Sequence, residues 1–283
     1  MTSQTSEPEL ESIAVPARRG DVFAEVTTLL CDADGNLFPS EEPAFVASAQ
    51  VLNRFLAEHG VQRHYEAEEL RLATTGMNFR STVVAIALEH QIPVAPELVP
   101  AAAAQPERSG QQAAGLTRQS LDQWIGAEKE AVTEYLQTVL RPDPEVLEPL
   151  TTLAERFAVA AVSSSADARI AACFEVTGLA HFFPAERRFS AEDSLSRPIS
   201  KPDPAIYLYA GGQLGLGPQQ GVAIEDSVAG ATSAVAAGFP TIGNLQFVAQ
   251  AERADRHAAL TQLGVSAIVT SWQEILDLLP HAD

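Results

Sequence analysis

Short apolar runs alternate with amphipathic stretches through the second half of the chain. The apolar runs predict strands at residues 157–162, 222–224, 240–242 and 267–270. Apolar residues at helical spacing predict helices at residues 145–156, 167–177, 204–214, 228–237 and 272–279. Strands that alternate with helices favour a parallel, doubly wound sheet of the α/β class.

The first half has one apolar, β-prone run, at residues 26–31, and then a long stretch without a convincing strand. Helical patterns occur there at residues 43–58, 67–72, 81–90 and 120–140. Residues 91–116 are rich in Ala, Pro and Gln and predict a long loop or a weakly ordered insertion. This pattern indicates a helical insertion after the first strand.

Three parts of the chain follow from these patterns. Residues 1–20 are polar and acidic and predict a disordered or loosely docked tail. Residues 21–39 and 142–283 are expected to form a Rossmann-like α/β core. Residues 40–141 are expected to form an all-helical domain inserted into that core.

Composition and charge narrow the choice of partners and compartment. Of 283 residues, 37 are acidic and 18 basic, giving a net charge of −19 that disfavours nucleic acid or an anionic membrane as a partner. The two cysteines, Cys31 and Cys173, cannot form a disulfide framework, and Cys31 lies inside an apolar run as a small buried residue would. With neither a signal-peptide pattern nor a membrane-spanning run, we expect a cytoplasmic monomer or small homo-oligomer.

The first candidate site follows the apolar run at residues 26–31, where Asp32 and Asp34 precede Gly35. In an open α/β sheet, ligands bind in the crevice beyond the carboxyl ends of the strands. Two carboxylates there repel each other, and a Mg²⁺ ion bound by oxygen ligands would relieve the repulsion. One carboxylate could attack a phosphorus atom while the other handles protons. Taken alone, the pair fits a turn with two solvated acids equally well.

Two further clusters could bind phosphate. Ser163, Ser164 and Ser165 follow a predicted strand, and their hydroxyl and N–H groups suit a phosphate oxygen at a helix N-terminus. Simple capping of the next helix is the alternative. Lys201 stands before two prolines on a stiff segment, so it could clamp phosphate or pair with Asp32. A surface lysine in a loop is the alternative there.

A second acidic pair, Glu225 and Asp226, ends another predicted strand and again suggests Mg²⁺. Capping of the following helix by Asp226 or Ser227, with the acids complementing the helix dipole, is the alternative. The conjunction of all four clusters, each at a strand end or in a loop, favours one joint site over four separate structural explanations.

With these clusters in this order, the chain resembles the haloacid dehalogenase-like (HAD) hydrolase superfamily. That pattern is an apolar strand followed by DxDGT, then Ser or Thr, Lys, and an acidic pair. The chain looks most like the phosphatase and β-phosphoglucomutase-like branch, which carries a helical cap after the first motif. The segments KPDPAIY and IEDSVAGATSAVAAG are close to that branch, and the resemblance covers residues 26–242.

The resemblance implies a role for each matching residue. Asp32 matches the nucleophile that forms an aspartyl-phosphate, and Asp34 matches the general acid/base whose backbone carbonyl is a second Mg²⁺ ligand. Ser163 matches the hydroxyl that binds the transferring phosphoryl group, beside the Ser164 amide. Lys201 matches the lysine that neutralises nucleophile and phosphate.

The second acidic pair completes the implied metal site, where Asp226 matches a Mg²⁺ ligand and Glu225 its neighbour, which often acts through water. Asn36 departs from the pattern because Thr usually stands there, and Cys31 stands where Phe is common. Arg80 falls where such caps place a specificity loop and could hold a second anionic group. An exposed arginine at a helix start is the alternative.

The expected function is therefore a Mg²⁺-dependent phosphatase that hydrolyses a small phosphorylated metabolite through an aspartyl-phosphate. The runner-up is a phosphomutase of the β-phosphoglucomutase type, which would use the same residues and a second hydroxyl in place of water. A third reading is a non-catalytic protein that binds phosphorylated metabolites on the same fold.

Overall fold

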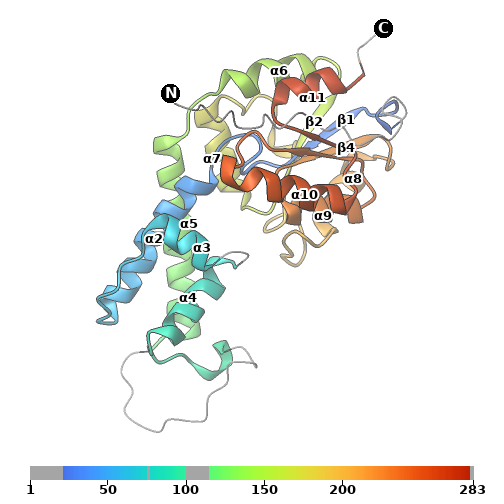
Figure 1. Cartoon of the computed structure of the whole chain (residues 1–283). Coiled ribbons are helices and arrows are strands. Elements are labelled where there is room, and N and C mark those ends of the chain that lie inside the picture. Colours follow the sequence, from blue (N-terminus) through green and yellow to red (C-terminus); the bar gives the residue numbers. More distant parts are fainter. Residues whose placement is uncertain (1–21, 75–76, 100–114, 281–283) are drawn as a thin grey trace, which may run out of the picture. The chain divides into compact units, whose positions relative to one another are not determined.

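A computed structural model describes residues 22–74, 77–99 and 115–280 of the chain. The expectations for residues 1–20 and for most of residues 91–116 lie outside the described residues. The chain divides into two compact units, one of residues Ser40–Val139 and one formed by the segments on either side, up to Pro39 and from Leu140 onward (Figure 1). Each unit is described by itself.

The larger unit is built on a six-stranded sheet of order β3-β2-β1-β4-β5-β6, in which every strand pair is parallel. Its strands are β1 (Thr28–Cys31), β2 (Ala158–Ser163), β3 (Arg188–Ser190), β4 (Gly221–Glu225), β5 (Thr241–Asn244) and β6 (Ala267–Val269). The first strand lies at the centre, where Leu30 pairs with Ala160 on one side and Ala223 on the other. A parallel strand flanked on both sides is buried on both faces, which explains its apolar sequence.

Helices cover both faces of this sheet. They are α6 (Pro144–Ala154), α7 (Asp167–Thr177), α8 (Ala205–Leu214), α9 (Val228–Ala236), α10 (Arg253–Leu263) and α11 (Trp272–Leu278). Helices α6 and α11 pack against each other, and Figure 1 shows α8, α9 and α10 on the opposite side of the sheet. On that side, Ile206 and Tyr207 of α8 join Leu30 of β1 in one hydrophobic cluster. The predicted doubly wound parallel sheet is confirmed.

One strand and one α-helix of this unit were not predicted from the sequence. Strand β3 has three residues, of which only Phe189 is apolar, so it forms no apolar run. Helix α10 buries a single side chain, that of Leu260, so its sequence shows little apolar periodicity. The other predicted strands and helices lie within a few residues of the observed ones.

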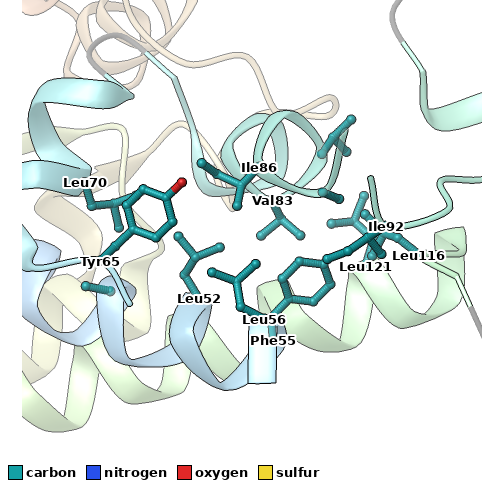
Figure 2. Packing of buried hydrophobic residues seen from close by; sticks show 13 residues of the cluster. Leu52, Phe55, Leu56, Tyr65, Leu70, Val83, Ile86, Ile92, Leu116 and Leu121 are labelled. Atoms are coloured by element: carbon teal, nitrogen blue, oxygen red, sulfur yellow. The ribbon is translucent and has the colours of Figure 1, made fainter. Parts of the chain in front are cut away.

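The smaller unit is helical and has its own core. It contains α2 (Glu41–Glu58), α3 (Ala67–Ala73), α4 (Phe79–Glu89), the short 3-10 helix η1 (Pro96–Leu98) and α5 (Arg118–Val139). Figure 2 shows the buried side chains that these helices and their connections contribute: Leu52, Phe55, Leu56, Tyr65, Leu70, Val83, Ile86, Ile92, Leu116 and Leu121. The most extensive packing is between α2 and α5. A core of this size lets the unit fold as a compact body.

Across the described residues, none of the helices combines the length and the apolar character needed to cross a membrane.

Candidate active site

The carboxyl ends of three adjacent strands carry the candidate residues. Asp32 directly follows β1, Ser163 ends β2 and Glu225 ends β4. Because β2, β1 and β4 are parallel neighbours, these ends lie along one edge of the sheet. The backbone N–H of Asp32 also donates to the carbonyl of Ile224, at 2.9 Å. The topology thus brings residues that are far apart in the sequence to one place.

Lys201 lies at the centre of this group, with only 5% of its side chain exposed. Its Nζ donates to Asp32 Oδ1 at 2.5 Å, Glu225 Oε1 at 2.7 Å and the Val162 carbonyl at 2.7 Å. These three acceptors match the three hydrogens of an ammonium group. Burial by itself would lower the pKa of Lys201, but the two carboxylates raise that pKa above its ordinary value, so the side chain remains charged.

Asp32 is the buried acid of the first pair, with 7% of the residue exposed. Burial raises the pKa of its carboxyl group to about 8, a rise that Lys201 opposes and Glu225 reinforces. A second cation beside this carboxylate would favour its ionised form, the form that can act as a nucleophile.

A divalent cation fits the acids at this edge of the sheet. Asp32, Glu225 and Asp226 are all buried, and each offers a carboxylate oxygen within 4.8 Å of the others. The loop approaches Asp226 closely, because a Cβ added to Gly35 would lie 2.5 Å from Asp226 Oδ2. Gly35 also has a φ of +77°, which glycine adopts without strain. Clustered carboxylate oxygens are the ligands that Mg²⁺ prefers.

The two carboxylate oxygens of Glu225 lie in different environments. Oε1 accepts hydrogen bonds from Lys201 and from the Tyr207 hydroxyl, the latter at 2.5 Å. Oε2 is buried and has no hydrogen-bond partner among the described residues. An orphaned buried carboxylate oxygen is costly, and a cation or its bound water would satisfy it. This observation supports a place for Glu225 at the edge of a metal site.

If these acids bind Mg²⁺, the ion will raise the thermal unfolding temperature of the chain. Binding only to the folded state stabilises it by about 2.7 kcal/mol at a hundredfold excess over Kd. The expected result is a higher melting temperature in Mg²⁺ than in EDTA, with little or no rise in Asp226→Asn. Asp255→Asn, which removes an exposed acid of α10, is the charge-matched control. Equal Mg²⁺-induced rises in the two variants would contradict the assignment.

The three serines at the carboxyl end of β2 and directly after it have three different partners. Ser163 Oγ accepts from the Ser165 N–H at 3.0 Å, and Ser164 Oγ accepts from the Lys201 N–H at 3.4 Å. Ser165 Oγ donates to Asp34 Oδ2 at 2.6 Å. Helix α7 begins after Ala166 without a side-chain cap, so the alternative that these serines cap it is wrong. The cluster is joined to the acid pair and to the lysine.

For the second acidic pair, Glu225 and Asp226, the alternative explanation was capping of the following helix by Asp226 or Ser227. The structure supports this alternative for Ser227 and not for Asp226. Ser227 does cap α9, because its hydroxyl accepts from the Gly230 N–H at 3.0 Å. Asp226 is not the capping residue, and its side chain is 4% exposed. Arg256 of α10 donates to the backbone carbonyl of Asp226 at 2.6 Å. The cap and the candidate metal ligand are therefore adjacent but separate.

Asp34 contacts an arginine to which the sequence pattern gave no role. Arg169 Nη2 lies 3.1 Å from Asp34 Oδ1, and both side chains are about one-quarter exposed, at 25% and 24%. With Ser165 on the other oxygen, both oxygens of this carboxylate are engaged. An arginine on the first turn of an amphipathic helix carries no signal of this contact in the sequence.

Arg80 lies in the helical unit, at the start of α4. Its Nη2 is 2.5 Å from Asp122 Oδ1 of α5, and its side chain is 49% exposed. This ion pair shows how the arginine is held within its own unit. Its role in binding a second anionic group stays a prediction.

Asn36, which departs from the family pattern, is completely buried and joins two strand ends. Its Nδ2 donates to the carbonyl of Asp32 at 2.9 Å and to that of Ile224 at 3.2 Å. Its Oδ1 accepts from Asn244 Nδ2 at 2.9 Å, and its backbone carbonyl accepts from Trp272 Nε1 at 2.9 Å. A threonine hydroxyl has one hydrogen and could not donate to both carbonyls. The amide thus connects the backbone of Asp32 to the end of β4.

Asn36→Asp will test this link, because aspartate has nearly the same shape but no amide hydrogens. The Asp32 and Ile224 carbonyls would lose the amide donor, the Ile224 carbonyl keeping the Asp32 N–H, and a buried charge would appear. The expected cost is at least about 2 kcal/mol in unfolding free energy. Urea denaturation measures that loss, and Asn36→Thr should lose less because it remains neutral. A loss below about 0.5 kcal/mol in Asn36→Asp would show that the amide network contributes little.

A model of the haloacid dehalogenase-like hydrolase family matches residues 26–238. That match spans most of the chain, from the strand before Asp32 to the end of the helix after Asp226. The chain therefore belongs to the haloacid dehalogenase-like hydrolases, and it is an enzyme of that class. No curated protein matches the chain.

Several solved structures share the fold at low sequence identity. A HAD family hydrolase from Deinococcus radiodurans, with bound phosphate and sodium, is 22% identical over 92% of this chain and 100% of its own, with a TM-score of 0.60. A predicted phosphoglycolate phosphatase from Haemophilus somnus is 19% identical over 90% and 98%, with a TM-score of 0.64. CbbY from Rhodobacter sphaeroides, in complex with xylulose-(1,5)bisphosphate, is 20% identical over 90% and 100%, with a TM-score of 0.60.

Proposed function

We propose that the chain is a Mg²⁺-dependent phosphatase that hydrolyses a small phosphorylated metabolite through an aspartyl-phosphate on Asp32. The arrangement around Lys201 is the observation that carries this proposal. A buried carboxylate at the end of the central strand contacts a buried lysine, and it lies within 4.8 Å of two further acids. This arrangement supplies a nucleophile, a counter-charge and a cation site together.

In the first step, an Asp32 oxygen attacks the phosphorus atom and the bond from phosphorus to the ester oxygen breaks. Asp34 gives its proton to the departing alcohol. In the second step, water attacks the phosphorus of the aspartyl-phosphate and Asp34 takes a proton from that water. The bond from phosphorus to Asp32 then breaks, which releases phosphate and restores both carboxyl groups.

The other residues of the site hold charge and orient the phosphoryl group. When bound, Mg²⁺ would offset the negative charges of the phosphoryl group and of Asp32. Lys201 has protein acceptors for all three of its hydrogens, so it would act on the phosphoryl group mainly by its charge. Ser163 and the backbone amide of Ser164 would bind phosphoryl oxygens.

The similar structures support this choice of substrate class. One has bound phosphate, one is a predicted phosphoglycolate phosphatase and one is in complex with a sugar bisphosphate. The helical unit Ser40–Val139 would serve as the cap that selects the substrate.

A panel of phosphorylated metabolites will test the proposal. Purified protein in Mg²⁺ should release inorganic phosphate from at least one member, and EDTA should abolish the release. Transfer of phosphate between positions of a sugar phosphate, seen by NMR without net release, would instead indicate a phosphomutase. A folded protein that turns over no member in Mg²⁺ would contradict both enzyme readings and favour a binding protein.

A further inference from the structure

The acid/base carboxylate of the proposed mechanism is held at both of its oxygens by one short segment. Ser165 Oγ lies 2.6 Å from Asp34 Oδ2, and Arg169 Nη2 lies 3.1 Å from Asp34 Oδ1. Ser165 is in the loop after β2, and Arg169 is on the first turn of α7, which starts at Asp167. Two donors on two different oxygens fix both the direction and the rotation of a carboxylate. We call this pair of residues the Asp34 clamp.

The segment that carries the clamp, residues 165–169, is itself hydrogen-bonded to side chains of strand β3 and of the turn after it. Ser190 Oγ donates to the carbonyl of Ser165 at 2.8 Å. Asp193 Oδ2 accepts from the Asp167 N–H at 2.7 Å, and Arg188 Nε lies 2.8 Å from Asp167 Oδ1. These bonds are made through residues to which the sequence assigned no role. The segment that carries the clamp is therefore itself held by side-chain hydrogen bonds and an ion pair.

We infer that Ser165 and Arg169 are positioning residues that hold the Asp34 carboxylate in the orientation it needs for proton transfer. The inference rests on the proposed function, because it gives Asp34 the acid/base role. A proton-transferring group must lie within hydrogen-bond reach of the reacting oxygen, and small misplacements of catalytic groups cost rate. Neither residue needs to touch the substrate for this role.

Substitutions of Arg169 and Ser165 will test the clamp when kcat and KM are measured with p-nitrophenyl phosphate in Mg²⁺. Arg169→Met should lower kcat by about 10- to 100-fold while KM changes by less than about threefold. Arg169→Lys should recover part of kcat, and Ser165→Ala should show a smaller loss than Arg169→Met. Arg187→Met is the matched control, since Arg187 immediately precedes β3, the outermost strand on this side of the sheet, which β2 separates from β1. An unchanged kcat in Arg169→Met would overturn the inference.

Chemical rescue separates a positioning role from a structural one. Guanidinium, well below denaturing concentration, should raise kcat of Arg169→Ala several-fold and should leave Ser165→Ala and the wild-type chain unchanged. Urea, which is neutral and similar in shape, should rescue none of them. A kcat loss that follows the melting temperature and does not respond to guanidinium would overturn the inference.

A measurement without turnover keeps the clamp distinct from the proposed function. NMR spectra of the folded wild-type chain and of folded Asp34→Asn are compared. The side-chain N–H signals of Arg169 should differ in chemical shift between the two. The signals of Arg187 should stay in place. If the wild-type chain hydrolyses no phosphoester, the proposed function fails, and the shift alone then decides whether the clamp exists. Unshifted Arg169 signals would overturn it.

Discussion

Replacing Asp32 with asparagine should abolish phosphoester turnover while the chain remains folded. An amide cannot form the aspartyl-phosphate, so the loss in kcat should be at least about 10³-fold. The fold should survive because Lys201 keeps two of its three acceptors, Glu225 and the Val162 carbonyl. Phosphate release and circular dichroism on the same preparation measure the two effects.

Asp255→Asn makes the same chemical change on an exposed turn of α10 and should keep full activity. The comparison separates the nucleophile from a general effect of removing one negative charge. Substantial residual phosphatase activity in Asp32→Asn would remove Asp32 from the nucleophile role.

The second large effect is expected from Lys201→Met, which keeps most of the length of the side chain but removes its charge. Two buried carboxylates, those of Asp32 and Glu225, would lose their shared counter-ion. Breaking a buried ion pair by removing one partner costs about 3–5 kcal/mol in unfolding free energy. Urea denaturation in EDTA measures the loss in unfolding free energy. In a separate assay in Mg²⁺, phosphate release by Lys201→Met should be at least a hundredfold slower than that of the wild-type chain.

Lys129→Met, at an exposed position on α5, is the matched control and should change stability by less than about 0.5 kcal/mol. Mg²⁺ should restore stability more in Lys201→Met than in the wild-type chain, because a cation at the acid cluster replaces part of the missing charge. A loss below about 1 kcal/mol in Lys201→Met would contradict the central place given to this lysine.

Much of the fold could be predicted because its core strands are buried and its helices are amphipathic. The run at residues 26–31 is apolar since β1 lies between two parallel neighbours. Strand β3 and helix α10 could not be predicted, because Phe189 is the only apolar residue of the former and the latter buries only Leu260. Local patterns report apolar burial, and these two elements bury only one apolar side chain each, Phe189 in β3 and Leu260 in α10.

Some residues of the candidate site could likewise be predicted from the sequence, and others could not. The acid pairs and Lys201 could be proposed because charged residues directly after apolar strands, or on a stiff loop, stand out locally. The partners of Asp34 could not, because Ser165 is 131 positions away and Arg169 is 135 positions away. The sequence singled out Asn36 only because Thr usually stands at that position in the family pattern. Its function depends on carbonyls and an amide that tertiary packing brings together.

The most direct test of the account is to look for the phosphoryl group on the protein. The chain is mixed with p-nitrophenyl phosphate and Mg²⁺, stopped with acid within a single turnover, digested, and analysed by mass spectrometry. We expect a phosphorylated peptide whose modification maps to Asp32 and which is absent from Asp32→Asn. Turnover by the wild-type chain with the phosphoryl group on another residue, or on none, would contradict it.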